Sequence, residues 1–324
     1  MGPDEKRGSG MGIDSDGKHA AYEYTTFPRQ FVTYAWYKPL LVGALTALFT
    51  FLSQGALFLV TGAWLGSLDA VGEAMKRSSE HFFSGPGALS AIGGVAAVLP
   101  ALAIAVRIVQ DRPFSSYSSS RGGWNWVAFG KCLIVAVVIL GSMFFGEALF
   151  FPDSAADGIV RFSVIGAVMC VVLVPIQAAA EEYLYRGLLM QTIGSWTGRP
   201  LVAVVLSSII FAISHSYGVL GIIAVLVDGL GFAFLTWYSK GLEASSATHA
   251  INNLMAFFFT GLGIAPTSEG GMESLAVSVA MMAAYCVAIV VLDRKFGWFT
   301  SRGDGTVEFN ERHQLTKEPD RDDA

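Results

Sequence analysis

Long apolar runs constrain the fold of this chain more than any other feature of its sequence. About 20 consecutive apolar residues are enough to cross the hydrocarbon core of a bilayer. We place such runs at about 40–62, 88–109, 127–150, 162–190, 200–215, 219–239, 245–262 and 274–292. The fifth and seventh are short and interrupted by polar residues. The runs predict an all-α fold, a polytopic membrane helical bundle with about eight membrane-embedded helices.

The composition supports an integral membrane protein. Of the 324 residues, 53% are hydrophobic and 15% charged, whereas soluble domains carry about 25% charged residues. We assign 35–295 to one membrane bundle, 1–34 to a polar, disordered cytoplasmic tail and 296–324 to a second polar cytoplasmic tail.

The sequence gives no sign of a nucleic-acid partner, because it has no basic patch. Three cysteines lie in apolar runs at spacings that fit neither a disulfide framework nor a zinc site: Cys132, Cys170 and Cys286.

Tryptophans and positive charges predict how the bundle lies in the membrane. All seven tryptophans fall near the ends of predicted spans, as in an aromatic belt: Trp36, Trp64, Trp124, Trp126, Trp196, Trp237 and Trp298. Lysines and arginines gather on alternate connections: Arg29, Lys38, Arg107, Arg112, Arg121, Lys131, Arg199, Lys240, Arg294, Lys295 and Arg302. The positive-inside rule then predicts that both termini are cytoplasmic, in the plasma membrane if the source is a prokaryote.

A charged cluster interrupts the fourth run. Glu181, Glu182 and Arg186 follow an apolar stretch of the same predicted helix, where each ionisable group costs roughly 2.5 to 3.5 kcal/mol to insert. Glu182 and Arg186 have the i, i+4 spacing of an ion pair, which would either brace the structure or position a substrate. Glu181 points about 100° away and has no local partner, which makes it a candidate general base.

Further polar residues lie on later runs. His215 closes the fifth run, and His249 opens the seventh, one turn before Asn253. Each has an alternative structural interpretation, since polar side chains also join helices inside membranes. If these groups share one pocket with Glu181, they supply a base, imidazoles that orient water or bind a metal, and an amide donor. Such a set suits peptide hydrolysis, in which water is activated and an oxyanion stabilised.

Three motifs in this order resemble those of the CPBP family. They are Glu181-Glu182-x-x-x-Arg186-Gly187, Phe211-x-x-x-His215 and His249-x-x-x-Asn253, within a half of the bundle at 160–262. The family comprises type II CAAX prenyl endopeptidases and related bacteriocin-processing or immunity proteins, also called Abi proteins.

The resemblance implies an intramembrane endopeptidase that acts on a membrane protein or peptide. Glu181 and His215 would activate water, His249 and Asn253 would stabilise the oxyanion, and Glu182 with Arg186 would shape the site. The family is described as either metal- or glutamate-dependent. If a divalent metal such as zinc binds, Glu181, His215 and His249 are its expected ligands. Two alternatives stay open: a non-proteolytic binding, immunity or scaffold protein of the same fold, and a proton-coupled transporter.

Overall fold

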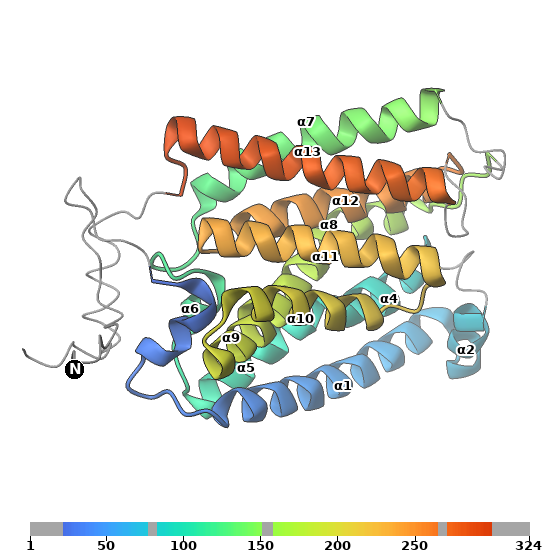
Figure 1. Cartoon of the computed structure of the whole chain (residues 1–324). Coiled ribbons are helices and arrows are strands. Elements are labelled where there is room, and N and C mark those ends of the chain that lie inside the picture. The colour runs from blue at the N-terminus through green and yellow to red at the C-terminus, as the bar shows by residue number, and fades with distance from the viewer. Residues whose placement is uncertain (1–21, 77–82, 151–157, 265–270, 300–324) are drawn as a thin grey trace, which may run out of the picture.

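The computed structural model describes residues 22–76, 83–150, 158–264 and 271–299, which contain helices and no β-strand (Figure 1). This confirms the all-α prediction. The longer helices are α1 (Lys38–Leu65), α2 (Leu68–Lys76), α4 (Gly85–Ala96), α5 (Val98–Val109), α7 (Trp126–Phe150), α8 (Val164–Glu182), α10 (Pro200–Ile213), α11 (Val219–Ser239), α12 (Glu243–Gly261) and α13 (Met272–Phe296). A π-helix, η2 (Tyr183–Met190), and the short α9 (Gln191–Thr197) continue α8.

Six continuous helical stretches of the described residues are long and apolar enough to cross a membrane. They are Lys38–Leu65, Gly85–Val109, Trp126–Phe150, Val164–Thr197, Val219–Ser239 and Leu275–Phe296. Two of the eight predicted runs, 200–215 and 245–262, are not among these six, and they are the runs that are short and interrupted by polar residues. Helix α10 is apolar but has only 14 residues. Helix α12 is polar at its start, where every residue from Glu243 to Ile251 is buried in protein and therefore needs no apolar, lipid-facing surface.

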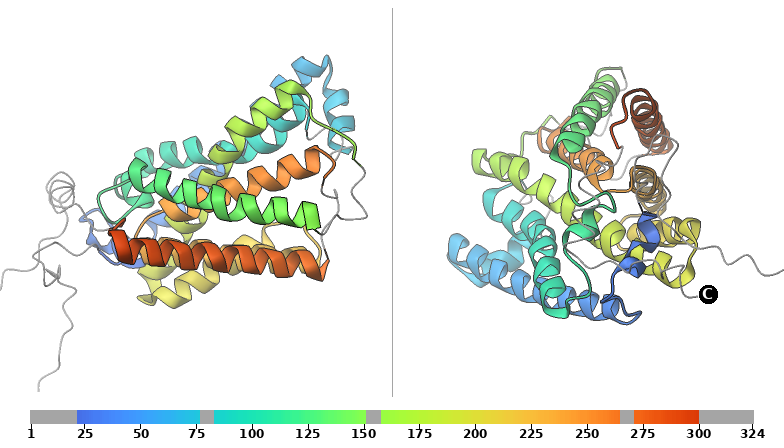
Figure 2. Two further views of the ribbon diagram at one scale, coloured as in Figure 1. Left: turned by 90° about the horizontal axis from the view of Figure 1, so that it is seen from above. Right: turned by 90° about the vertical axis from the view of Figure 1, so that its left-hand side faces the viewer.

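The helices run roughly side by side. Figure 1 shows α7 and α13 along one side of the bundle and α1 along the opposite side, with α8, α11 and α12 between them. The end-on view in Figure 2 agrees. Helix α12 packs against α7, α8 and α11, and α8 also packs against α4. The segments that carry the candidate site are therefore at the centre of the bundle.

Local sequence fixes where several of these helices begin and end. Ser163 precedes α8 and its side chain accepts a hydrogen bond from the backbone N–H of Gly166 at 2.9 Å, a typical N-cap. Pro39 lies in the first turn of α1, where its missing N–H costs nothing. Gly66 and Gly297 follow α1 and α13 with φ of 85° and 61°, the left-handed conformation that glycine adopts without strain.

The folded part of the chain begins earlier than the sequence analysis places it. Residues 24–34, which we assigned to a disordered tail, include the 3₁₀-helix η1 (Tyr24–Gln30), in which Tyr24 and Phe27 are fully buried. The Tyr24 hydroxyl donates to the carbonyl of Tyr117 at 2.6 Å. The aromatic side chains explain the difference, because their burial outweighs the polar composition around them. Residues 1–21 and 300–324 of the predicted tails lie outside the described residues.

The connection between α5 and α7 is a loop that is packed into the protein. It contains the short α6 (Ser115–Ser118), and Tyr117 is fully buried. Arg121 pairs with the buried Glu243 at the start of α12, with Nη2 and Oε2 2.6 Å apart. A Cβ added to Gly187 would lie 3.0 Å from the carbonyl oxygen of Tyr117, so glycine there allows the loop to approach η2 closely.

The lysines and arginines that the sequence places on alternate connections agree with the positions of the helix ends in the structure. The start of α1 and the ends of α5 and α13, which carry Lys38, Arg107 and Arg294, lie at the same end of the bundle (Figure 1). Which membrane face this end occupies stays a prediction from the positive-inside rule.

Candidate active site

Two parts of the chain that are far apart in the sequence, α8 with its continuation η2 and α12, supply most of the candidate site. Glu181 and Glu182 are the last residues of α8, and Arg186 follows in η2. Helix α12 supplies His249 and Asn253. The π-helix begins directly after the two glutamates, and short π-helical segments are frequent at functional sites because they alter side-chain direction within an otherwise regular helix.

The predicted ion pair of Glu182 and Arg186 is present and fully buried. Arg186 Nη1 donates to Glu182 Oε1 at 2.9 Å, and both side chains are 0% exposed. Arg186 Nη2 donates to the carbonyl of Gly229 on α11 at 2.9 Å. The guanidinium also lies over the rings of Phe211, at 4.4 Å, and Phe232, at 5.2 Å. Glu182 and Arg186 thereby connect α8, η2, α10 and α11.

His249 lies between the two glutamates. Its Nδ1 is 2.9 Å from Glu182 Oε1, and its Nε2 is 3.3 Å from Glu181 Oε2. The imidazole stacks on Phe232, with ring centroids 4.6 Å apart. His249 is therefore held through Nδ1 by the buried Glu182, and its other ring nitrogen, Nε2, faces Glu181 at the longer distance.

Glu181 has a different environment from Glu182. Its Oε1 accepts a hydrogen bond from Gln177 Nε2 at 2.8 Å, and Gln177 Oε1 accepts one from Asn253 Nδ2 at 3.2 Å. The Glu181 side chain is 12% exposed. Its Oε2 makes no hydrogen bond beyond the 3.3 Å contact with His249 Nε2, and Glu182 Oε2 likewise has no hydrogen-bond partner among the described residues. One oxygen of Glu181 is thus held by the Gln177 amide, and the other faces the His249 imidazole.

His215 lies beside this network rather than within it. Its Nδ1 is 2.8 Å from the carbonyl oxygen of Phe211, and because a carbonyl only accepts, Nδ1 is the donor; in a neutral imidazole the lone pair is then on Nε2. The Phe211 ring contacts both imidazoles, with centroids 4.8 Å from His215 and 5.9 Å from His249. The structure therefore brings five of the six predicted side chains into one network of hydrogen bonds and ionic contacts, and Phe211 links His215 to it.

The sequence analysis missed Gln177 and Asp228. Gln177 stands four residues before Glu181, the same i, i+4 spacing that identified the Glu182–Arg186 pair, so the signal was available. Asp228 is an acidic residue inside the apolar α11, which is itself a marker of function in membrane helices. It is close enough to His249 and Arg186 to interact with both electrostatically.

The described residues do not offer a ready metal site. They contain no group of three or more His, Cys, Asp or Glu side chains arranged to hold a metal ion. Both ring nitrogens of His249 face carboxylate oxygens, so this residue has no free lone pair directed at a shared point with Glu181 and His215. We therefore derive no chemical step through a metal.

Comparison with known proteins agrees with the motifs. Residues 161–255 match the family described as type II CAAX prenyl endopeptidase Rce1-like, which confirms the predicted resemblance to the CPBP family. The chain is 28% identical over 174 residues to the uncharacterized protein YyaK of Bacillus subtilis (strain 168). That alignment covers 50% of this chain and 57% of the relative. No solved structure matches the chain significantly.

Proposed function

We propose that this integral membrane protein is an endopeptidase that hydrolyses a peptide bond of a membrane-associated protein or peptide. The similarity of residues 161–255 to type II CAAX prenyl endopeptidases supports this class of reaction. The protein would act within the bilayer, with both termini in the cytoplasm and, in a prokaryote, in the plasma membrane.

The observation that carries the proposal is the contrast between two adjacent glutamates. Glu182 is 0% exposed and receives both Arg186 and His249, so its charge is compensated. Glu181 is 12% exposed and faces His249 Nε2 at the longer distance of 3.3 Å. A partly exposed carboxylate with one long ionic contact contributes little to a purely structural cluster. A general base requires such a carboxylate, because it must accept a proton from water.

The reaction can be written from these side chains. Glu181 takes a proton from a water molecule, which the lone pair at Nε2 of His215 helps to orient. The water oxygen bonds to the carbonyl carbon of the substrate, and the carbonyl oxygen becomes an oxyanion. The C–N bond then breaks, and Glu181 returns its proton to the leaving amine. This is hydrolysis with one residue acting first as base and then as acid.

Asn253 and His249 are the proposed donors to the oxyanion. Asn253 uses one amide hydrogen to bond Gln177, which leaves its second hydrogen for a substrate oxygen. Because Glu182 holds the ring through Nδ1, the Nε2–H of His249 becomes available to the oxyanion when the partly exposed Glu181 carboxylate, 3.3 Å away, moves from it. Preorganised donors of this kind stabilise charge as it develops.

A comparison of membrane-protein fragments tests the proposal. Membranes with the wild type are compared by mass spectrometry with membranes that carry Glu181→Gln, which removes the base and nearly preserves volume. The matched control is Glu273→Gln, at the exposed start of α13. We expect fragments that occur with the wild type and the control and disappear with Glu181→Gln. Identical fragments in all three samples would contradict proteolysis and favour a binding or transport role.

A further inference from the structure

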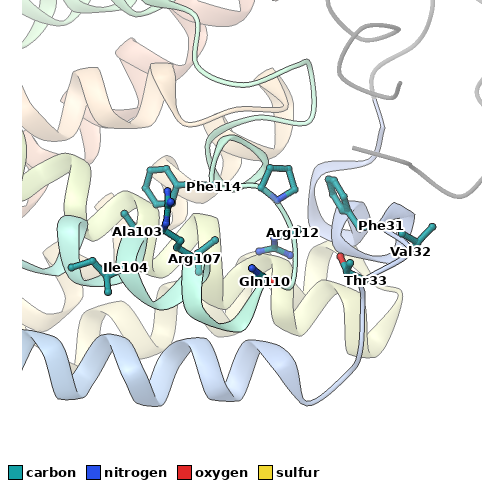
Figure 3. Close-up of a pocket in the computed structure, with 11 residues that line it drawn as sticks. Phe31, Val32, Thr33, Ala103, Ile104, Arg107, Gln110, Arg112 and Phe114 are labelled. Carbon is teal, nitrogen blue, oxygen red and sulfur yellow. The ribbon is translucent and has the colours of Figure 1, made fainter. Parts of the chain in front are cut away.

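A cavity lies at one end of the bundle and shares no lining residue with the Glu181 network. Its volume is about 720 Å³. Its walls come from α5, from residues 31–33 after η1 and from residues 112–114 of the buried loop. Figure 3 shows Ala103, Ile104 and Arg107 of α5 on one side of it and Phe31, Val32 and Thr33 on the other.

The apolar part of this cavity opens toward the lipid-facing surface. Ile104 is 48% exposed on α5, which belongs to a helical stretch apolar enough to cross a membrane, and Val32, in the connection between η1 and α1, is 56% exposed. Trp36 and Tyr37 follow residues 31–33 and are also exposed. Exposed tryptophan and tyrosine at the end of a membrane helix mark the level of the lipid headgroups. The cavity therefore lies where headgroups meet acyl chains.

The polar part of the cavity is positively charged and incompletely satisfied. Arg107 is exposed, whereas the side chain of Arg112 is only 1% exposed. Arg112 Nη2 donates to the carbonyl of Gly187 at 3.3 Å, and the guanidinium lies 3.8 Å from the ring centroid of Tyr117. Its Nε and Nη1 have no hydrogen-bond partner. Buried donors without a partner are rare and indicate a ligand or water that completes them.

The surrounding charges leave a net positive site. Asp111 is the carboxylate beside Arg112, with Oδ2 3.8 Å from Arg112 Nε, and the same oxygen accepts from the Tyr117 hydroxyl at 2.7 Å. Burial raises the pKa of that hydroxyl well above its usual value, so it keeps its proton and remains a donor to Asp111. Lys38 adds a further cation at the rim, where its Nζ donates to the carbonyls of Thr33, at 2.9 Å, and Gln110, at 3.3 Å.

We propose that this cavity binds an anionic phospholipid. Arg112 and Arg107 would hold the phosphate, and the acyl chains would extend along Ile104 and Val32. Guanidinium groups match the geometry of phosphate oxygens, and basic pockets beside membrane helices recognise anionic headgroups. A nonionic amphiphile has no phosphate to accept hydrogen bonds from Arg112, and in phosphatidylcholine, which does have one, the choline cation is repelled by the net positive charge of the site. This site is independent of the proposed proteolysis.

Lipid titration of the full-length protein in detergent tests the proposal. Native mass spectrometry measures retention of phosphatidylglycerol and, separately, of phosphatidylcholine. We expect the wild type to prefer phosphatidylglycerol. We expect Arg107→Gln and Arg112→Gln each to weaken its binding about fivefold, the effect of one basic side chain near an anionic lipid. The matched control is Arg294→Gln, an exposed arginine at the same end of the bundle on α13, which does not line the cavity.

Two results would overturn the proposal. One is equal retention of phosphatidylglycerol by Arg107→Gln and Arg294→Gln; since Arg107 is exposed, this comparison stands even if Arg112→Gln does not fold. The other is displacement of the lipid by inorganic phosphate at equal concentration, which would identify a site for a soluble anion. Retention of the lipid under that competition supports a site that needs both phosphate and acyl chain.

Discussion

The two adjacent glutamates should respond oppositely to the same substitution. Glu182 Oε1 lies 2.9 Å from both Arg186 Nη1 and His249 Nδ1, and the Glu182 and Arg186 side chains are fully buried. Glu182→Gln leaves the guanidinium without a counter-charge inside the bundle, and breaking a buried pair in this way costs about 3–5 kcal/mol. Glu181→Gln keeps an oxygen that accepts the hydrogen bond of Gln177 and loses only the longer, partly exposed contact with His249. We therefore expect it to lower the free energy of unfolding by about 1 kcal/mol.

The activity should follow the reverse order. Glu181→Gln removes the proposed base, and general base catalysis contributes about 10²- to 10⁴-fold to a rate. Denaturation in detergent, followed by tryptophan fluorescence, measures the free energy of unfolding of each variant. A peptide-cleavage assay on the folded fraction measures kcat. We expect Glu181→Gln to be stable and inactive, and Glu182→Gln to be unstable but active where folded.

A double variant separates the charge imbalance from the loss of packing. Glu182→Gln combined with Arg186→Met removes both charges and keeps similar volumes, and we expect it to recover more than half of the stability lost by Glu182→Gln alone. Equal destabilisation by Glu181→Gln and Glu182→Gln would contradict the roles assigned to the two glutamates. An inactive, folded Glu182→Gln together with a normal cleavage rate for Glu181→Gln would contradict them as well.

Other predictions test the rest of the site and the topology. Asn253→Ala should lower kcat about 10²- to 10³-fold with little change in KM, the loss expected for one oxyanion donor; normal kcat would remove Asn253 from the catalytic set. Gln177→Leu should shift the pH–rate profile, because the amide holds the proposed base Glu181; an unchanged profile with lower stability would indicate a structural role only. Dialysis against a chelator should leave the rate unchanged, whereas loss of activity restored by zinc would establish a metal enzyme. A reporter at Asp157 should be external and one after Arg302 cytoplasmic, and reporters on the same side would contradict the topology.

The local features of this protein follow from its sequence. Apolar runs and turn residues give the helices, because a helix needs only a suitable stretch of chain and a cap at each end. The Glu182–Arg186 pair is predictable for the same reason, since its two members are neighbours on one helix. The family resemblance also follows from sequence alone, because the three motifs are defined by residue type, spacing and order along the chain.

The relations between helices are decided only by tertiary structure. His249 lies against Glu182 across 67 positions of sequence, and Asn253 bonds Gln177 across 76. Such contacts depend on how each helix is rotated and how deeply it is inserted, which the hydrophobic pattern leaves open because nearly every face of these helices is apolar. For the same reason the sequence shows two adjacent carboxylates of the same type, and only packing makes Glu182 a fully buried partner of Arg186 while Glu181 stays partly exposed beside His249.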